Sequence, residues 1–77
     1  MDYVEAIRAE RQRQDAKWGQ QHHPAAVWCA ILMEEVGEVA NAILDSRSTN
    51  LEDELIQVAA VSVAWLEAIG SFPKEQR

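Results

Sequence analysis

Four glutamates in the sequence have the type and spacing of a metal site. They are Glu34, Glu35, Glu38 and Glu54, and we call them the glutamate cluster. Glu34 and Glu38 lie four residues apart, and Glu35 lies three before Glu38, so on a helix these three share one side. Mg²⁺ binds to carboxylate oxygens, usually together with waters and the phosphates of a substrate. The spacing therefore predicts a site where carboxylates hold Mg²⁺.

The surroundings of the glutamates favour this interpretation. Residues 18–46 contain no Lys or Arg, whereas an ordinary solvated helix face pairs Glu with Lys one turn away. Stacked like charges are unfavourable unless a cation or protons neutralise them. Val27, Ile31 and Ala42 lie among the glutamates on the helical wheel, so the face is not purely polar. A solvated surface patch is the competing interpretation.

The apolar residues recur with helical spacing, which predicts an all-α fold of three helices and no strands. The chain of 77 residues has room for one domain, residues 1–77. The expected helices cover about residues 2–17, 24–46 and 51–69. Ser48, Thr49 or Asn50 can cap the third helix, and Gly70 is expected just beyond its end.

The third expected helix predicts an assembly. It carries apolar residues nearly all round, and such a helix is buried on all sides. A chain of 77 residues with three helices cannot easily enclose one of them. We therefore expect a three-helix protomer that completes a four-helix-type bundle as a homodimer or tetramer.

Composition excludes several classes. The formal net charge is −6 with seven Lys and Arg, whereas a nucleic-acid-binding protein needs a basic face. Residues 58–66 form the longest apolar stretch, far below the about 20 residues that span a bilayer. No signal-peptide pattern occurs at the start, and the single Cys29 fits a reducing compartment. We expect a cytoplasmic protein without a membrane or nucleic-acid partner, and Cys29 as a small core residue.

The first expected helix has a face that changes character midway. Its narrow apolar stripe consists of Tyr3, Val4, Ile7 and then Trp18, and the polar Arg11 and Gln14 continue the same face. This change predicts that the far end of the helix approaches a wet pocket. An exposed, frayed helix end is the alternative.

The sequence resembles a known enzyme family over about residues 3–69. The run Glu34-Glu35-x-x-Glu38, followed by Glu54, is similar to the signature of the MazG-like all-α nucleoside triphosphate pyrophosphohydrolases. The segment Glu10-Arg11-x-x-Gln14-x-x-Lys17-Trp18-Gly19-x-Gln21 resembles the short phage and bacterial members. The resemblance implies a helical bundle assembled as a dimer or tetramer. It also implies bound Mg²⁺, with Mn²⁺ as a substitute, and cleavage of a nucleoside triphosphate to a monophosphate and pyrophosphate.

The resemblance also implies roles for individual residues. Glu35, Glu38 and Glu54 would be metal ligands. Glu34 would be a further ligand or would orient the attacking water, so the expected catalytic residues are Glu34, Glu35 and Glu38. Gln57 stands where the family has Asp, and its carbonyl oxygen can still coordinate a metal, without charge. Asp53, one turn earlier, could substitute in part.

Substrate binding is expected at the first helix. The candidates are Arg11, Gln14, Lys17 and Trp18: the two cations would contact phosphates, and Trp18 would stack on a base. Exposed surface charges and a core tryptophan are the alternatives. Because of Gln57, two other functions stay open: a relative that binds metal or nucleotide without turnover, and a purely structural oligomeric bundle.

Overall fold

The computed structural model describes residues 1–45 and 50–70, which form three helices and no strand. The helices are α1 (Tyr3–Trp18), α2 (Ala25–Leu44) and α3 (Leu51–Gly70). The predicted all-α class is confirmed, and the helix ends lie within two residues of those expected. Gly70 is the last residue of α3 and does not follow it. Of the three proposed caps for α3, Ser48 and Thr49 lie outside the described residues.

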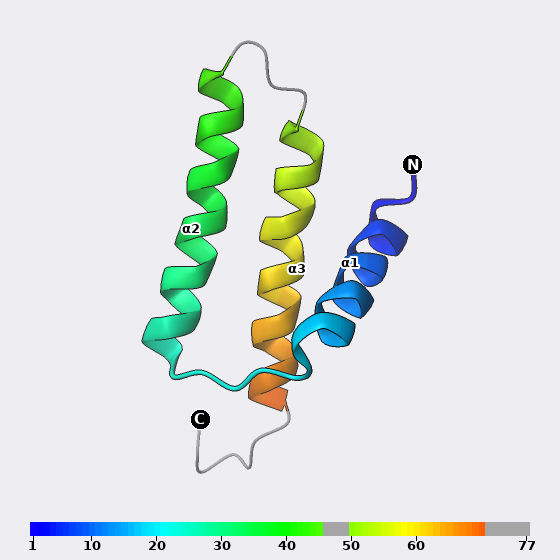
Figure 1. The fold of residues 1–77 in the computed structure, drawn as a ribbon, viewed down its shortest axis with the longest axis vertical. Helices are drawn as coiled ribbons and strands as arrows, with labels where there is room; N and C mark the ends of the chain where they lie inside the picture. The colour runs from blue at the N-terminus through cyan, green and yellow to red at the C-terminus, as the bar shows by residue number, and fades with distance from the viewer. Residues whose placement is uncertain (46–49, 71–77) are drawn as a thin grey trace.

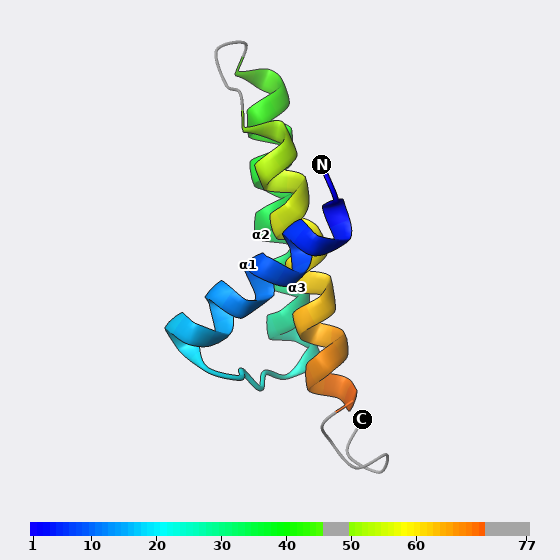
Figure 2. The same cartoon turned by 90° about the vertical axis from the view of Figure 1, so that its right-hand side faces the viewer.

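The helix α3 lies in the middle, with α2 on one side of it and α1 on the other. In Figure 1, α2 and α3 lie side by side and run in opposite directions, while α1 lies on the other side of α3. Figure 2 shows that α1 crosses α3 at an oblique angle. In the part of the chain described here, α3 contacts both other helices, and α1 and α2 do not contact each other. The backbones of α1 and α2 are therefore held apart, each against α3.

Local chemistry explains where α1 begins and ends. The side chain of Asp2 accepts a hydrogen bond from the backbone N–H of Glu5 at 3.1 Å, which satisfies one of the free donors at the helix start. The helix ends at Gly19, whose φ of 71° lies in the left-handed region that glycine adopts without strain.

The other two helices also begin where the sequence favours it. Pro24 precedes α2, and its carbonyl oxygen accepts hydrogen bonds from the N–H groups of Val27 and Trp28. The first turn of α3 contains Glu52, Asp53 and Glu54. Negative charge there is favourable because the helix dipole is positive at its N-terminus.

A small core joins α2 to α3. Trp28 of α2 is 4% exposed and contacts the buried Val61 and Ala68 of α3. Its ring stacks on that of Trp65, with 6.4 Å between centroids. Small residues, Ala60, Ala64 and Ala68, recur every four residues along α3, and they let neighbouring helices approach closely.

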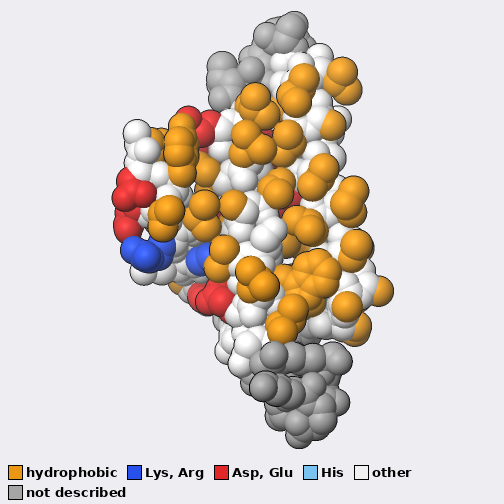
Figure 3. Space-filling model, turned by 180° about the vertical axis from the view of Figure 1, so that it is seen from behind, with side chains coloured by type: hydrophobic (Ala, Val, Ile, Leu, Met, Phe, Trp, Pro, Cys, Tyr) orange, Lys and Arg blue, Asp and Glu red, His pale blue; other side chains and the backbone are white. Residues whose placement is uncertain are grey.

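One expectation about burial, that Cys29 is a core residue, is wrong within the single chain, whereas the exposure of α3 agrees with the expectation that one chain cannot enclose it. Cys29 is exposed, because it lies on the side of α2 away from α3. The helix α3 is not enclosed, since Leu55 and Leu66 are 52% and 66% exposed. Figure 3 shows apolar side chains spread over α2 and α3 on the face opposite to that of Figure 1. The helical wheel identified α3 as apolar, but it does not tell how much of the apolar surface of α3 this chain covers.

None of the helices in residues 1–45 and 50–70 is long and apolar enough to cross a membrane.

Candidate functional site

The antiparallel pairing of α2 and α3 brings the glutamate cluster together. Glu35 and Glu54 are partly buried between the helices, and Glu34 and Glu38 are exposed. Burial raises the pKa of Glu35, and repulsion from Glu54, Glu34 and Glu38 raises it further. A carboxyl group responds in this way to charges within Coulombic reach, so the other three glutamates act on Glu35.

No described cation neutralises this cluster. The ion pairs among the described residues join Arg8 to Glu5, Arg11 to Asp15 and Glu67, and Arg13 to Glu10. None of them involves a member of the glutamate cluster. Residues 18–46 contain no Lys or Arg, and no described Lys or Arg elsewhere in the chain forms an ion pair with the glutamate cluster.

The donor set suits Mg²⁺ in its chemistry, since it consists of hard oxygen ligands with unneutralised charge. As the side chains lie, no three His, Cys, Asp or Glu residues in the described part of the chain converge closely enough to hold a metal ion. Glu34 and Glu38 are exposed and lie one helical turn apart, so their carboxylates can meet by a change of rotamer. Metal binding at this site requires that rearrangement.

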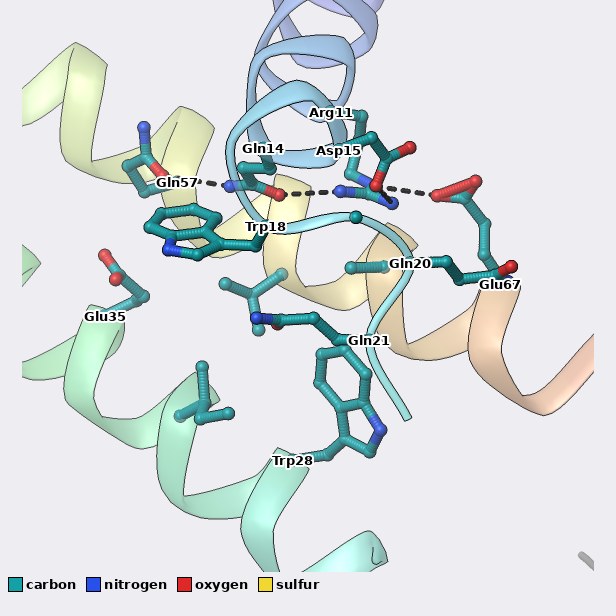
Figure 4. A pocket seen from close by; sticks show the side chains of 14 residues that line it. Arg11, Gln14, Asp15, Trp18, Gln20, Gln21, Trp28, Glu35, Gln57 and Glu67 are labelled. Carbon is teal, nitrogen blue, oxygen red and sulfur yellow. Dashed lines mark hydrogen bonds and ion pairs between the residues drawn. The ribbon is translucent and has the colours of Figure 1, made fainter. Parts of the chain in front are cut away.

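A cavity of about 220 Å³ lies beside Glu35. All three helices and the segment after α1 contribute to it, and Figure 4 shows the side chains around it. Polar and aromatic residues surround the opening, and Val61, Ala64 and Ile31 supply apolar lining. The lining residues are Arg11, Gln14, Asp15, Trp18, Gly19, Gln20, Gln21, Trp28, Ile31, Glu35, Gln57, Val61, Ala64 and Glu67.

A chain of hydrogen bonds runs along one wall of the cavity, from Gln57 to Glu67 of α3 by way of α1 (Figure 4). Gln14 Nε2 donates to Gln57 Oε1 at 3.3 Å, and Gln14 Oε1 accepts from Arg11 Nη1 at 2.9 Å. Arg11 Nε in turn donates to Glu67 Oε1 at 2.7 Å, and its Nη2 to Asp15 at 2.9 Å. Burial by itself lowers the pKa of Arg11, but these two carboxylates outweigh it and raise the pKa. This wall fixes α1 on α3.

The predicted substrate residues divide into two groups. Arg11, Gln14 and Trp18 line the cavity, so the expectation that the far end of the first helix approaches a pocket is confirmed. Lys17 is exposed and does not line the cavity; its Nζ lies 4.6 Å from the centre of the Trp18 ring. The guanidinium of Arg11 already has three protein partners. Gln14 also bonds three protein groups, on Arg11, Glu10 and Gln57, so Trp18 is the candidate best placed to meet a ligand.

The two positions discussed as a replacement for the family's Asp behave differently. Gln57 lines the cavity, but its carbonyl oxygen, the only atom through which an amide ligates a metal, accepts the bond from Gln14. Asp53 is exposed and is not part of the cavity wall. Asp53 therefore does not take the place of Gln57 in the cavity wall.

Sequence reasoning missed three residues near the site. Gln20 and Gln21 line the cavity from the segment after α1. Glu10 lies close enough to Glu35 to raise its pKa. One signal for Glu10 was available, because Glu10 and Gln14 lie four residues apart and share a face of α1. No sequence pattern indicates that this face meets Glu35 across α3.

We expect Glu35→Gln to stabilise the metal-free protein at neutral pH. The folded protein holds a proton on Glu35 more tightly than the unfolded chain does, because the pKa of Glu35 is raised. Stability is therefore lost as the pH rises from the unfolded pKa, about 4.3 for Glu, through the raised folded value. Melting curves in EDTA should show the variant a few degrees more stable at pH 8 and no different at pH 4.

Glu52→Gln is the matched control, because Glu52 carries the same charge but lies exposed in the first turn of α3. Its melting temperature should not show the same gain between pH 4 and pH 8. A Glu35→Gln protein that melts at or below the wild-type temperature at pH 8 would contradict the crowding of charge around Glu35.

A comparison of the chain with family models, with curated proteins and with solved structures found no match.

Proposed function

We propose that this protein is a Mg²⁺-dependent nucleoside triphosphate pyrophosphohydrolase that uses the glutamate cluster to hold the metal. One observation supports it above the others: partly buried and exposed carboxylates of two helices gather without a described cation, next to a cavity. An acidic protein can bind a triphosphate at such a site when a divalent cation lies between the two. The resemblance in sequence motifs supports the same function.

The reaction joins water to the α-phosphorus and breaks the bond from that phosphorus to the oxygen bridging to the β-phosphorus. The products are the nucleoside monophosphate and pyrophosphate. Mg²⁺ bound there would offset phosphate charge and lower the pKa of a water. Glu35, Glu38 and Glu54 would hold the metal, and Glu34 would be a further ligand or the group that orients the attacking water. In the cavity, Trp18 offers an exposed ring for stacking on the base.

We propose further that the active form is a homodimer or tetramer. The support is the large apolar surface left by one chain: only Trp28, Ala60, Val61 and Ala68 are buried hydrophobic residues in the described part. A second α2–α3 pair laid on the face in Figure 3 would complete a four-helix arrangement and remove that surface from water. Size-exclusion chromatography with light scattering should give at least twice the mass of one chain, and a stable monomer would contradict the assembly.

The function is tested by incubating the purified protein with each common NTP and dNTP plus Mg²⁺ and measuring pyrophosphate. We expect release of pyrophosphate, not of single phosphate, with at least one nucleotide, and no release in EDTA. Mn²⁺ should partly replace Mg²⁺. Release of orthophosphate alone would contradict the proposed bond cleavage.

The position of Gln57 favours one alternative, a protein that binds metal or nucleotide without turnover. Its amide adds no charge to the site, and its carbonyl oxygen is engaged by Gln14. Mg²⁺-dependent thermal stabilisation without pyrophosphate release from any nucleotide would support this alternative. If Mg²⁺ has neither effect, the glutamates are solvated and the protein is a structural bundle.

A further inference from the structure

Helix α2 carries an apolar stripe apart from the one that packs on α3. Its members follow one another at alternating spacings of three and four residues, and all of them are exposed. This alternation is the pattern with which one helix packs along another. Residues on the side that faces α3, such as Trp28 and Ile31, do not belong to it. The members, which we call the α2 stripe, are Ala26, Cys29, Met33, Val36, Ala40 and Ile43.

Helix α3 carries a stripe of the same kind, with spacings of four and three residues. The members, which we call the α3 stripe, are Leu55, Ala59, Ser62, Leu66 and Ile69. Its three largest side chains, those of Leu and Ile, are exposed. Its single polar member, Ser62, is already satisfied, because its hydroxyl donates to the carbonyl oxygen of Val58 at 3.0 Å. Both helices therefore present a surface suited to packing against a further helix.

Both stripes lie on one face of the α2–α3 pair. At about 100° per residue, each stripe centres roughly a quarter to a third of a turn from the residues that join the two helices, and it does so on the same side of the pair. Figure 3 shows this face, where apolar side chains cover α2 and α3. On the same wheel Glu34, Glu35 and Glu38 centre on the opposite side of α2. The apolar face and the glutamates of α2 therefore point in opposite directions.

The charge of this face favours a second copy of the chain as the partner. Neither stripe contains Asp, Glu, Lys or Arg, although the chain has a formal net charge of −6. A basic partner would find no carboxylate in the stripes to pair with. Two acidic chains repel one another where their carboxylates approach, and burying an unpaired carboxylate is costly. On the two stripes, identical copies can meet without either penalty.

The area of the face is also sufficient for a stable dimer. Two helices of 20 residues each, about 30 Å long and about 10 Å wide, have a joint footprint of about 600 Å². Side chains that protrude make the accessible surface larger than this footprint. A standard interface buries about 800 Å² of accessible surface on each partner, so one such face meets the requirement.

The order of side-chain sizes selects one arrangement of the two copies. When α2 lies antiparallel on α2 of the second copy, about the middle of the α2 stripe, Ala26 lies opposite Ile43 of the second copy. Cys29 then lies opposite Ala40 of the second copy. Small residues thus face larger ones, as in well-packed helix layers. The α2 stripe is therefore complementary to its own reverse.

The same arrangement lays α3 antiparallel on α3 of the second copy. The middle of the α3 stripe holds Ala59 and Ser62, whose small side chains let two helices approach closely. The larger Leu55 and Leu66 then face each other on either side of this contact. All neighbouring helices in the resulting four-helix bundle are antiparallel, which is the usual arrangement of such bundles.

We infer that the protein forms a two-fold dimer in which α2 packs antiparallel on α2 and α3 on α3, with Cys29 facing Ala40 of the second copy. The inference rests on the proposed homo-oligomer, to which it adds the partner's orientation and register. The glutamates of α2 lie on the outer side of this dimer, and α1 lies with them. Each protomer therefore keeps its own cavity uncovered.

The test uses Cys29, the single cysteine of the chain, to read the register in the full-length protein. In a two-fold interface each contact occurs twice, so Ala40→Cys places two cysteine pairs across the interface. After mild oxidation the variant should run as a covalent dimer on a non-reducing gel and as a monomer after reduction. Wild type should stay a monomer on the gel. The two Cys29 residues would lie about 16 Å apart along the helices, and a disulfide needs Cα atoms within about 7 Å.

Asn41→Cys is the matched control. Asn41 is exposed like Ala40 and lies next to it in the sequence, so the new thiol has the same height on α2. It is turned by about 100° toward the side of the glutamates. Oxidation of this variant should give no covalent dimer.

The reactivity of the thiols gives a second readout that needs no change at Ala40. In native wild type, Cys29 should react with Ellman's reagent much more slowly than in urea, because the second copy covers it. In native Asn41→Cys one thiol should react fast and the other slowly. If Ala40→Cys does not fold, this comparison still decides, because a Cys29 that reacts as fast in native wild type as in urea overturns the inference.

The outcomes separate the inference from the proposed function. A covalent dimer of Ala40→Cys, with none in wild type or Asn41→Cys, supports the inference. If light scattering shows an oligomer but Ala40→Cys does not cross-link, α2 does not pack on α2 in this register, and the inference alone fails. If wild type is a monomer, the inference and the proposed assembly both fail. Pyrophosphate release is measured separately and tests the proposed reaction in either case.

Discussion

Glu38→Gln is expected to lower pyrophosphate release by about 100-fold or more, the usual effect of removing a group that stabilises charge in a transition state. Glu38 shares a side of α2 with Glu34 and Glu35 and is exposed, so it can turn toward a metal. The amide keeps the size of the side chain and has similar helix propensity. The fold should therefore remain while the charge is lost.

Three measurements on the variant make this result specific. Far-UV circular dichroism should match wild type, and the metal-free melting temperature should not fall, because a like charge leaves the crowded face of α2. Mg²⁺ should no longer raise the melting temperature. Glu52→Gln removes an equal charge from exposed residues of α3 and should keep full activity. Activity within a few fold of wild type in Glu38→Gln would contradict the site.

Much of the fold was predictable because its determinants are local. The Asp2 cap, the break after Trp18 and the acidic first turn of α3 depend on residues a few positions apart. The exposure of Cys29 was not predictable in this way, because an apolar residue near the edge of a helix face can lie on either side of the boundary. How completely α3 is covered depends on the partner helices, which its own periodicity does not describe.

The candidate site also has a part that local sequence predicts and a part that depends on how the helices pack. Helical spacing alone places Glu34, Glu35 and Glu38 together. Glu54 joins them only because α2 and α3 are antiparallel and in a particular register, which depends on contacts between the two helices. The link from Gln14 to Gln57 depends on the oblique crossing of α1 over α3 in Figure 2. The residue pattern of one helix does not predict the angle at which another helix crosses it. Position 57 was therefore considered without its contact to Gln14.

Trp28→Ala is expected to destabilise the protein by about 3–5 kcal/mol, the range for removing a buried large aromatic side chain. Trp28 is the largest of the buried hydrophobic residues in the described chain and is 4% exposed. It joins α2 to Val61 and Ala68 of α3 and stacks on Trp65. Small domains have a free energy of unfolding of about 5 kcal/mol or little more. The variant should therefore keep only about 0–2 kcal/mol of stability, and melting curves by circular dichroism should show it unfolding at a much lower temperature than wild type.

Trp18→Ala is the contrasting variant, since both tryptophans line the cavity but Trp18 is 53% exposed. Its loss leaves the core intact, so the melting temperature should change little. A ring that stacks on a base contributes about 1–3 kcal/mol, so the KM for the nucleotide should rise about tenfold while kcat changes less. If Trp18→Ala unfolds the protein, Trp18 is a core residue. If KM is unchanged in a folded Trp18→Ala protein, the base does not stack on this ring, and recognition of the base must come from the amide groups of the cavity wall.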